Sequence, residues 1–334
     1  MSENSASNSV GRLASLLSNA VGEPVEIDEL TPLSGGAASM SYFVDARRGD
    51  APWPLILQQS ANETGSRRMT RAVQAAVQQR AGENGVPVPE IVYVLAPQDG
   101  LGEGFVMSFV PGESLAPRYL RRDQFGGARE ALTRQTAEAL AKLHSIRATA
   151  FDGLDLPVLD APAQLRMLRD SYDEMGGAVP VFEMAFVRLE RRLKPCSTPV
   201  LVHGDFRSGN FIVGEEGLRS VLDWELAHLG DPLLDIGWLC TNTWRFGNWR
   251  KPVGGFGERE EFYRAYEAAG GKPVDREQAA AMEMLGSLRW GVMCLQMAAG
   301  HLEGDAVSVE RAAIGRRVSE TEADLVYIMK EGRV

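Results

Sequence analysis

Oxygen-bearing side chains stand at intervals in one segment, residues 199–239, between short apolar runs. Asn210 follows Asp205 by five positions, and Asp223 follows Asn210 by thirteen. Carboxylate and amide oxygens are ligands that Mg²⁺ accepts, and Mg²⁺ usually leaves coordination positions for water and substrate phosphates. The residue types therefore indicate a metal site that holds a phosphorylated substrate.

The segments around these residues predict a strand, a polar loop and a β-hairpin. The apolar run 199–202 predicts a buried strand that leads into the loop containing Asp205. The runs 211–213 and 218–222 flank a turn at 215–217, which is a pattern typical of a hairpin. A strand and a hairpin would thus hold the polar residues at their ends.

This arrangement predicts that Asp205, Asn210 and Asp223 share one pocket. Antiparallel pairing brings the residue before the first hairpin strand beside the residue after the second, so Asn210 and Asp223 should meet. Phosphoryl transfer needs a hydroxyl that loses its proton, and Asp205 is the candidate general base. It also needs the phosphate charge to be neutralised, which we assign to Mg²⁺ on Asn210 and Asp223, with Arg207 as a phosphate contact.

Two short motifs resemble a known family. His203-Gly204-Asp205 with Asn210, and then Asp223-Trp224-Glu225, resemble the aminoglycoside phosphotransferase family, a branch of the protein-kinase-like superfamily. Residues 223–227 and 230–232 are similar to the kinase-like domains attached to some acyl-CoA dehydrogenases. The resemblance runs from about residue 25 to the C-terminus and is strongest over 199–239.

The resemblance implies an α+β, two-lobed protein-kinase-like fold. A strand-rich N-terminal lobe, residues 24–110, would hold an antiparallel sheet and one helix near 66–83 and would bind the nucleotide. A larger, mostly helical lobe, residues 111–334, would carry the catalytic hairpin and bind the acceptor. Residues 1–23 would form an extension that can be helical. Helical periodicity predicts helices in the larger lobe at 123–147, 161–174, 180–193, 258–269, 276–302 and 307–331.

The resemblance also implies roles for individual residues. It makes Asp205 the catalytic base and Asn210 and Asp223 the metal ligands, with Asp231 and Asp235 bracing the catalytic loop. The candidate catalytic set is Asp205, Arg207 and His203. Ser34, Gly35, Gly36 and Ser39 would cover the nucleotide phosphates, and Met107, Ser108, Phe109 and Val110 would form the hinge that meets the adenine. The implied cofactors are Mg²⁺ and ATP or GTP.

The sequence departs from the family at the residue that usually holds the α- and β-phosphates. The family has Lys or Arg on the third strand, and this chain has Gln58, with Gln74 where a partner Glu is expected. A missing charge-assisted contact costs about 1.5–3 kcal/mol. Arg67, Arg68 or Arg71 could reach in instead.

The acceptor side is predicted from the aromatic and basic stretch 244–251. In a chain of net charge −10, such a stretch favours an anionic or acyl-bearing acceptor, for example a hydroxyacyl-CoA, over a polycationic aminoglycoside. The candidate acceptor residues are Glu225, Trp244, Arg245, Trp249 and Arg250. The alternative is that these aromatic side chains only pack against the lobe.

Bulk properties narrow the functional class. The acidic charge argues against nucleic acid as a partner, and no apolar run reaches the roughly 20 residues of a membrane span. Cys196, Cys240 and Cys294 fit neither a disulfide framework nor a metal-ligand pattern, and the first ten residues resemble no signal peptide, which favours the cytoplasm. The oligomeric state stays open.

The predicted function is therefore a small-molecule kinase. Two alternatives remain: a nucleotide-binding regulatory module without turnover, which Gln58 favours, and a kinase of aminoglycoside or macrolide antibiotics.

Overall fold

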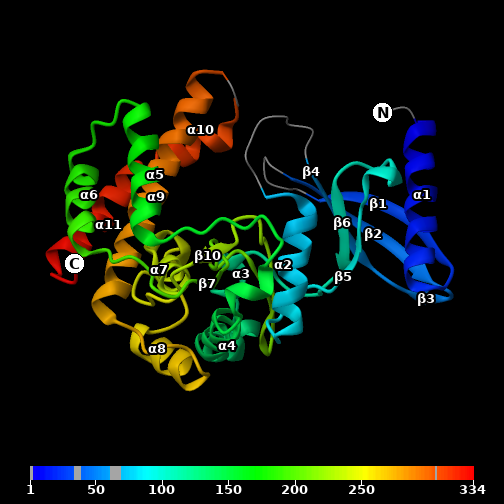
Figure 1. Cartoon of the computed structure of the whole chain (residues 1–334), viewed down its shortest axis with the longest axis horizontal. Coiled ribbons are helices and arrows are strands. Elements are labelled where there is room, and N and C mark those ends of the chain that lie inside the picture. Colours follow the sequence, from blue (N-terminus) through cyan, green and yellow to red (C-terminus); the bar gives the residue numbers. More distant parts are fainter. Residues whose placement is uncertain (1–2, 34–38, 61–68, 305–306) are drawn as a thin grey trace.

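The computed structural model describes residues 3–33, 39–60, 69–304 and 307–334. Figure 1 shows a smaller part built on a sheet and a larger, mostly helical part beside it. The strands are β1 (Val25–Leu33), β2 (Ser39–Arg48), β3 (Ala51–Pro52), β4 (Leu55–Ser60), β5 (Ile91–Val94), β6 (Gly104–Ser108), β7 (Val200–Val202), β8 (Phe211–Gly214), β9 (Gly217–Val221) and β10 (His228–Gly230). The helices are α1 (Glu3–Val21), α2 (Arg71–Glu83), α3 (Ala116–Tyr119), α4 (Gly126–His144), α5 (Ala161–Glu174), α6 (Pro180–Arg192), α7 (Leu233–Cys240), α8 (Arg259–Ala268), α9 (Arg276–Leu302), α10 (Val309–Gly315) and α11 (Val318–Lys330). The predicted α+β class is confirmed.

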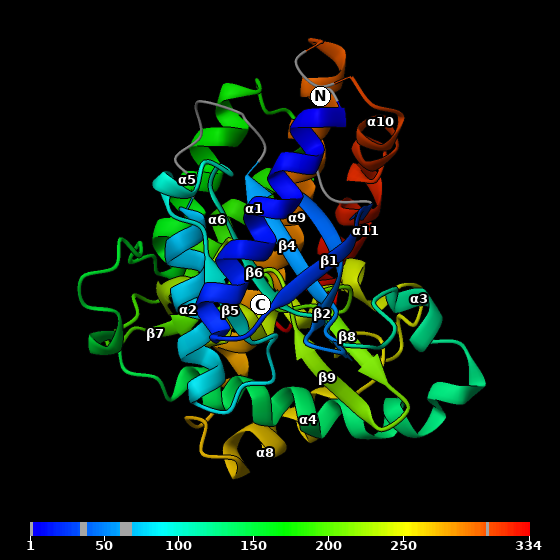
Figure 2. The same ribbon diagram turned by 90° about the vertical axis from the view of Figure 1, so that its right-hand side faces the viewer.

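The N-terminal sheet is antiparallel and has the strand order β1-β2-β4-β6-β5, with β3 paired to β2. Along β4 the side chains alternate, so Leu55 and Leu57 are buried on one face. This face packs against Leu13 and Leu17 of α1, which are spaced one helical turn apart and fully buried. Figures 1 and 2 show α1 lying across the outer face of the sheet.

Helix α2 lies on the opposite side of the sheet, between the sheet and the larger part (Figure 1). Its first turn is capped by Thr70, whose hydroxyl accepts a hydrogen bond from the amide of Val73 at 3.3 Å. The helix ends at Glu83, as the sequence predicts, but begins at Arg71 rather than at 66; residues 61–68 lie outside the described residues.

Among the described residues, the larger part has two large apolar clusters and a small one formed by Trp238, Trp244, Trp290 and Cys294. One cluster joins α4 and α8 to the hairpin β8–β9, and the other joins α5, α6 and α11 to the long helix α9. Helix α9 is capped by Asp275, whose carboxylate accepts hydrogen bonds from the amides of Glu277 and Gln278. Among the described residues, no helix combines the length and the apolar character that a membrane crossing requires. The division of the chain near residue 110 stays a prediction.

The single helix predicted at 307–331 is wrong, because two helices, α10 and α11, occupy this region. Gly315 ends α10 where the chain passes close to α9, and a Cβ atom there would lie 2.7 Å from the Cβ of Ala298. Glycine also has a low helix propensity. Close packing on α9 thus explains both the glycine and the break, which periodicity alone does not reveal.

Candidate functional site

The loop that carries Asp205, which is the predicted catalytic loop, begins where β7 ends, and Asp235 of α7 holds its first residues. The Asp235 carboxylate accepts hydrogen bonds from the amides of His203 at 2.8 Å and Gly204 at 2.9 Å. Gly204 has φ +80°, and a Cβ atom there would overlap the carbonyl oxygen of Leu226. This position therefore requires glycine, and Asp235 fixes the backbone that carries Asp205.

His203 ties the same loop to the hairpin. Its Nδ1 accepts a hydrogen bond from the amide of Asp205 at 3.2 Å, so Nε2 carries the hydrogen and donates to the carbonyl of Leu222 at 3.1 Å. Complete burial lowers the pKa of His203, so the ring is neutral near pH 7. These contacts make His203 a positioning group between the loop and the hairpin.

The carboxylate of Asp205 is held from three sides. The indole N–H of Trp238 donates to Oδ1 at 2.6 Å, and the amide of Asn210 donates to Oδ2 at 2.6 Å. Arg207 Nε lies 3.0 Å from Oδ1 and 3.1 Å from Oδ2. The carboxylate therefore has one defined orientation, which a general base requires.

The hairpin β8–β9 is confirmed by its register, which pairs Phe211 with Val221. The amide of Leu222 donates to the carbonyl of Asn210 at 2.8 Å, so Asp223 comes one position after the paired residues. Because the side-chain amide of Asn210 donates its N–H groups to Asp205, its Oδ1 is the atom that could bind a metal.

Asp223 has two unusual properties. Its backbone has φ +67°, a conformation that aspartate and asparagine tolerate better than most residues. Burial, and then the negative charges of Glu225 and Asp205, raise its pKa to about 7, while Arg207 and Arg71 oppose this rise. Protonation or a nearby cation would relieve such a carboxylate, and a divalent ion would do so most strongly.

The residues at this site fit Mg²⁺. Among the described residues, no group of three or more His, Cys, Asp or Glu side chains could hold a metal ion. The donor set instead includes the amide oxygen of Asn210 beside the carboxylate of Asp223, which is a chemistry that Mg²⁺ accepts when phosphates and water complete its shell.

Only some of the residues that are predicted to bind the nucleotide lie within the described part of the chain. Ser34, Gly35 and Gly36, as well as Arg67 and Arg68, lie outside the described residues, and Ser39 is the first residue of β2. Whether this loop covers phosphates stays a prediction.

Gln58 takes part in a chain of hydrogen bonds. Gln74 of α2 donates to Gln58 Oε1 at 3.4 Å, and Arg71 Nη1 donates to Gln74 Oε1 at 2.6 Å. Two neutral amides therefore stand where the family has an ion pair, and an arginine joins them from the start of α2.

In the predicted hinge, residues 107–110, the backbone amide of Val110 is open to a ligand. The Ser108 N–H donates to the carbonyl of Glu90, and the Phe109 N–H donates to that of Pro54. For Val110, no such bond occurs within the part of the chain that the structure describes. Met107 lies next to these residues at the end of β6. That the Val110 amide donates to an adenine nitrogen stays a prediction.

The predicted acceptor residues do not come together. Trp244 is buried beneath the guanidinium of Arg207, 4.2 Å from its ring centre, close to Asp205. Arg245 is buried in an ion pair with Glu283 at 2.9 Å. Trp249 is 57% exposed with Arg250 stacked on its ring, and Glu225 is half-buried near Asp223.

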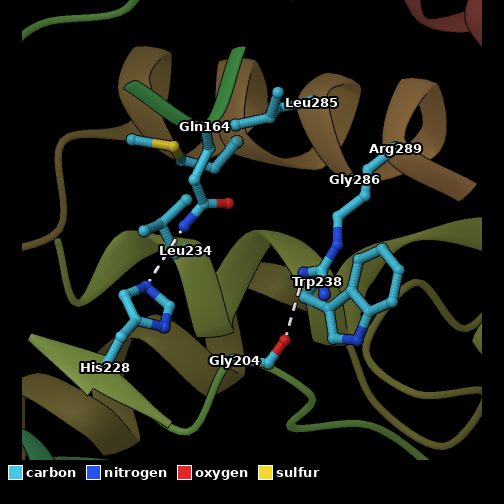
Figure 3. A pocket seen from close by; sticks show the side chains of 9 residues that line it. Gln164, Gly204, His228, Leu234, Trp238, Leu285, Gly286 and Arg289 are labelled. Atoms are coloured by element: carbon cyan, nitrogen blue, oxygen red, sulfur yellow. Dashed lines mark hydrogen bonds between the residues drawn. The ribbon is translucent and has the colours of Figure 1, made fainter. Parts of the chain in front are cut away.

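A pocket that the sequence analysis missed lies next to the catalytic loop (Figure 3). Arg289 of α9 stacks on Trp238, with 4.3 Å from its guanidinium to the ring centre, and donates to the Gly204 carbonyl at 3.1 Å. The cavity is small, about 10 Å³, which leaves room for about one water molecule. It is lined by Gln164, Gly204, His228, Leu234, Trp238, Met282, Leu285, Gly286 and Arg289.

No local pattern joins these lining residues, because they come from α5, the catalytic loop, β10, α7 and α9. Trp238 offers the one usable signal, since it stands one helical turn after Asp235 and so shares its face of α7.

Known proteins with similar sequences place this chain in a family. The model of the phosphotransferase enzyme family matches residues 29–279. Acyl-CoA dehydrogenase family member 10 from Mus musculus is 30% identical over 162 residues, which cover 47% of this chain and 15% of that protein. Acyl-CoA dehydrogenase family member 11 from Gallus gallus is 30% identical over 169 residues, covering 48% of this chain and 22% of that protein. The chain thus spans well under a quarter of the curated relatives it matches.

Solved structures show the same fold. A protein of Ralstonia eutropha JMP134, named as a candidate aminoglycoside phosphotransferase, superimposes with a TM-score of 0.75 at 17% identity, covering 96% of this chain and 98% of that one. Spectinomycin phosphotransferase in complex with ADP and spectinomycin gives 0.65 at 14% identity, covering 94% and 98%. The predicted kinase-like architecture is confirmed.

Proposed function

Because this chain belongs to the phosphotransferase enzyme family, we propose that it transfers the γ-phosphate of ATP or GTP to a hydroxyl of a small molecule. The observation that carries the proposal is the Asp205 carboxylate, which Trp238, Asn210 and Arg207 hold in one orientation near the half-buried Asp223. Asn210 and Asp223 would hold Mg²⁺, which neutralises phosphate charge when it is bound.

Each step of the reaction has a residue in a suitable place. Asp205 accepts the proton of the acceptor hydroxyl as that oxygen bonds to the γ-phosphorus. The bond between the γ-phosphorus and its bridging oxygen breaks, and the nucleoside diphosphate leaves with that electron pair. Arg207, half-buried beside Asp205, can contact the transferred phosphoryl group. The free amide of Val110 can bind the base.

Nucleotide binding should depend on the metal and on Asp223. Titration calorimetry with ATP and GTP should show binding that weakens at least about 10-fold when Mg²⁺ is removed. The same loss is expected when Asp223 is replaced by Asn, because the negative charge that would bind the metal is lost. Asn keeps the shape and suits the backbone of this position. The matched control is Asp152→Asn at an exposed position of the larger part, which should bind as the wild type does.

The alternative of a nucleotide-binding module without turnover is favoured by one observation, the neutral Gln58–Gln74 pair. Transfer of γ-phosphate label separates the two functions. Label appearing in any acceptor supports the kinase, and metal-dependent binding with no transfer to any acceptor supports the module. Failure of both nucleotides to bind the wild type would contradict both functions.

For the acceptor, we favour an anionic or acyl compound, and Arg289 supports this choice. Burial lowers the pKa of Arg289, while Asp205 and Asp235 oppose this. Among the described residues, its side chain makes one hydrogen bond although it has five N–H donors. An acceptor carboxylate that lies against the accessible part of Arg289 would pair with it beside the loop that carries Asp205. A polycation such as kanamycin would meet the same positive charge.

Replacing Arg289 by Gln should raise the KM for an anionic acceptor about 10- to 100-fold, because one charge-assisted contact is lost. The probes are 3-hydroxybutyryl-CoA, 3-hydroxybutyrate and kanamycin, with KM measured for those that the wild type phosphorylates. The result for Arg289→Gln is compared with that of a variant in which the charges of Arg250 and Lys251 are reversed. Both residues are exposed and belong to the stretch 244–251. If only the charge reversal raised KM, the acceptor would bind at 244–251 instead.

A further inference from the structure

One tryptophan of the stretch 244–251 lies on the surface. Trp249 is 57% exposed, and the guanidinium of Arg250 lies 4.8 Å from the centre of its ring. Among the described residues, Arg250 makes no ion pair with a carboxylate, so its charge is open to a ligand. An exposed aromatic ring beside such a cation suits a ligand that is both planar and anionic.

The backbone that carries Trp249 is held from inside the larger part. Buried Arg245 donates to the carbonyl of Trp249 at 3.0 Å and pairs with Glu283 at 2.9 Å. The side-chain amide of Asn248 donates to the carbonyl of Gly255 at 3.1 Å. Trp249 therefore stands on a fixed loop, which lowers the entropic cost of binding a ligand there.

A second segment brings another arginine to this loop. Arg121, which follows α3, donates from Nη2 to the carbonyl of Phe246 at 2.9 Å, and the same nitrogen lies 3.4 Å from the position of a Cβ atom at Gly247. Trp249 comes two residues after Gly247, so their Cα atoms are at most about 7 Å apart. Arg121 is exposed and, within the described ranges, has no carboxylate partner. It therefore offers a second charge close to Trp249.

The surface around Arg121 and Arg250 is basic, although the chain has a net charge of −10. Three carboxylates adjoin it. Glu113 pairs with two arginines, Glu258 pairs with a lysine at 3.1 Å, and Asp123 is exposed. They face five cations, which we call the basic patch: Arg118, Arg121, Arg122, Arg250 and Lys251.

The basic patch adjoins the loop that carries Asp205. The ring of Phe246 lies 3.8 Å from the position of a Cβ atom at Gly209. Ser208 donates to the carbonyl of Gly254 at 2.7 Å, which ties the same loop to the chain beyond Trp249. A ligand on the basic patch would therefore lie beside the loop with the predicted catalytic base.

We propose that the basic patch and Trp249 bind the nucleotide end of the acceptor, with the arginines on its phosphates and the indole ring against its base. The acceptor would be a hydroxyl compound joined to a phosphorylated nucleoside, as in a thioester of coenzyme A. A free hydroxy acid has no phosphate or base for this surface. The inference rests on the proposed function and names the surface that selects its acceptor.

The test titrates coenzyme A into protein saturated with ADP and Mg²⁺, so that the proposed nucleotide site is filled. The wild type should bind coenzyme A, and replacing both Arg121 and Arg250 by Gln should weaken this binding about 10- to 100-fold, because two charged contacts are lost. Pantetheine lacks phosphate and base, so its affinity should change less than about twofold. Replacing both Arg134 and Arg191 by Gln, at exposed positions of α4 and α6, is the control and should leave the affinity for coenzyme A unchanged.

A change at Trp249 tests the contact with the base. Trp249→Ala should weaken coenzyme A binding about 10-fold, because a stacking surface is lost. Trp249→Phe keeps an aromatic ring and should lose less. The affinity for pantetheine should be the same in both variants.

Equal affinity for coenzyme A in the wild type and in the folded double variant of Arg121 and Arg250 would overturn the proposal. So would a wild type that binds no coenzyme A while ADP is bound. If the double variant is unfolded by circular dichroism, Arg250→Gln decides, with an expected loss of about 5-fold, because this side chain makes no hydrogen bond among the described residues. Wild-type protein that binds neither ADP nor ATP would instead contradict the proposed nucleotide site, so the two failures are distinguishable.

Discussion

Asp205→Asn is expected to lower kcat about 1,000-fold while ADP affinity stays within about twofold of the wild type. Asparagine has the same shape and keeps one oxygen for the donors Trp238 and Asn210, which now contact two different carboxylate oxygens, but it cannot accept the proton of the acceptor hydroxyl. The rate is measured under saturating nucleotide and acceptor, with the hydroxy compound that the wild type phosphorylates. Calorimetry with ADP and Mg²⁺ gives the affinity.

The effect of Asp205→Asn on kcat can be compared with that of a change in its neighbour Trp238. Trp238→Phe removes the indole N–H that donates to Asp205 and keeps an aromatic ring in α7. Because the carboxylate remains, its effect on kcat should be smaller, about 10-fold, as expected for one lost orienting hydrogen bond. An Asp205→Asn protein that retained more than about a tenth of wild-type kcat would exclude proton acceptance by Asp205.

Glu283→Gln is expected to destabilise the protein by about 3–5 kcal/mol. The Glu283 carboxylate is 2% exposed on α9 and pairs with three arginines: Arg259 at 2.6 Å, Arg245 at 2.9 Å and Arg333 at 3.0 Å. A neutral amide would leave these three guanidinium groups close together without their shared anion. Urea unfolding at pH 7 measures the change in free energy. Glu138→Gln, in an exposed pair with Arg134, is the control and should cost less than about 1 kcal/mol.

We expect the Glu283 carboxylate to make the stability of the protein depend on pH. Burial alone would raise the pKa of Glu283, but Arg259, Arg333 and Arg245 outweigh burial and lower it. Because the pKa of Glu283 is lower in the folded state, its ion pairs stabilise the fold fully at pH values above the usual glutamate pKa of about 4.3. This stabilisation is lost as the pH falls through the folded-state pKa. The wild type should therefore lose more stability than Glu283→Gln on acidification from neutral pH. Parallel losses in the two proteins would exclude this ion cluster as the cause.

Local sequence patterns were enough to predict the centre of the site. Strand β7, the loop with Asp205 and the hairpin β8–β9 are consecutive, so periodicity and turn residues describe them directly. The antiparallel register then places Asn210 near Asp223 without further information. Their catalytic and metal-binding roles stay predictions.

The walls of the site could not be predicted in this way. Arg289 reaches Gly204 from 85 positions away, and Trp238 reaches Asp205 from 33. Such contacts depend on how α7 and α9 pack, and apart from the spacing of Trp238 and Asp235 on α7 the local sequence does not mark them. The stretch 244–251 was noticed because it is aromatic and basic, but charge alone cannot show that Arg245 turns inward to Glu283.

The backbone of Asp223 bears on how this chain can change by mutation. At φ +67°, most side chains are strained, and glycine and asparagine are the replacements that fit best. Both keep the turn after β9, and both remove the carboxylate. Substitutions that the fold tolerates at this position are therefore the ones that abolish its charge, so a lineage could lose activity in a single step and still retain a folded, abundant protein. Selection for stability alone would not preserve this aspartate.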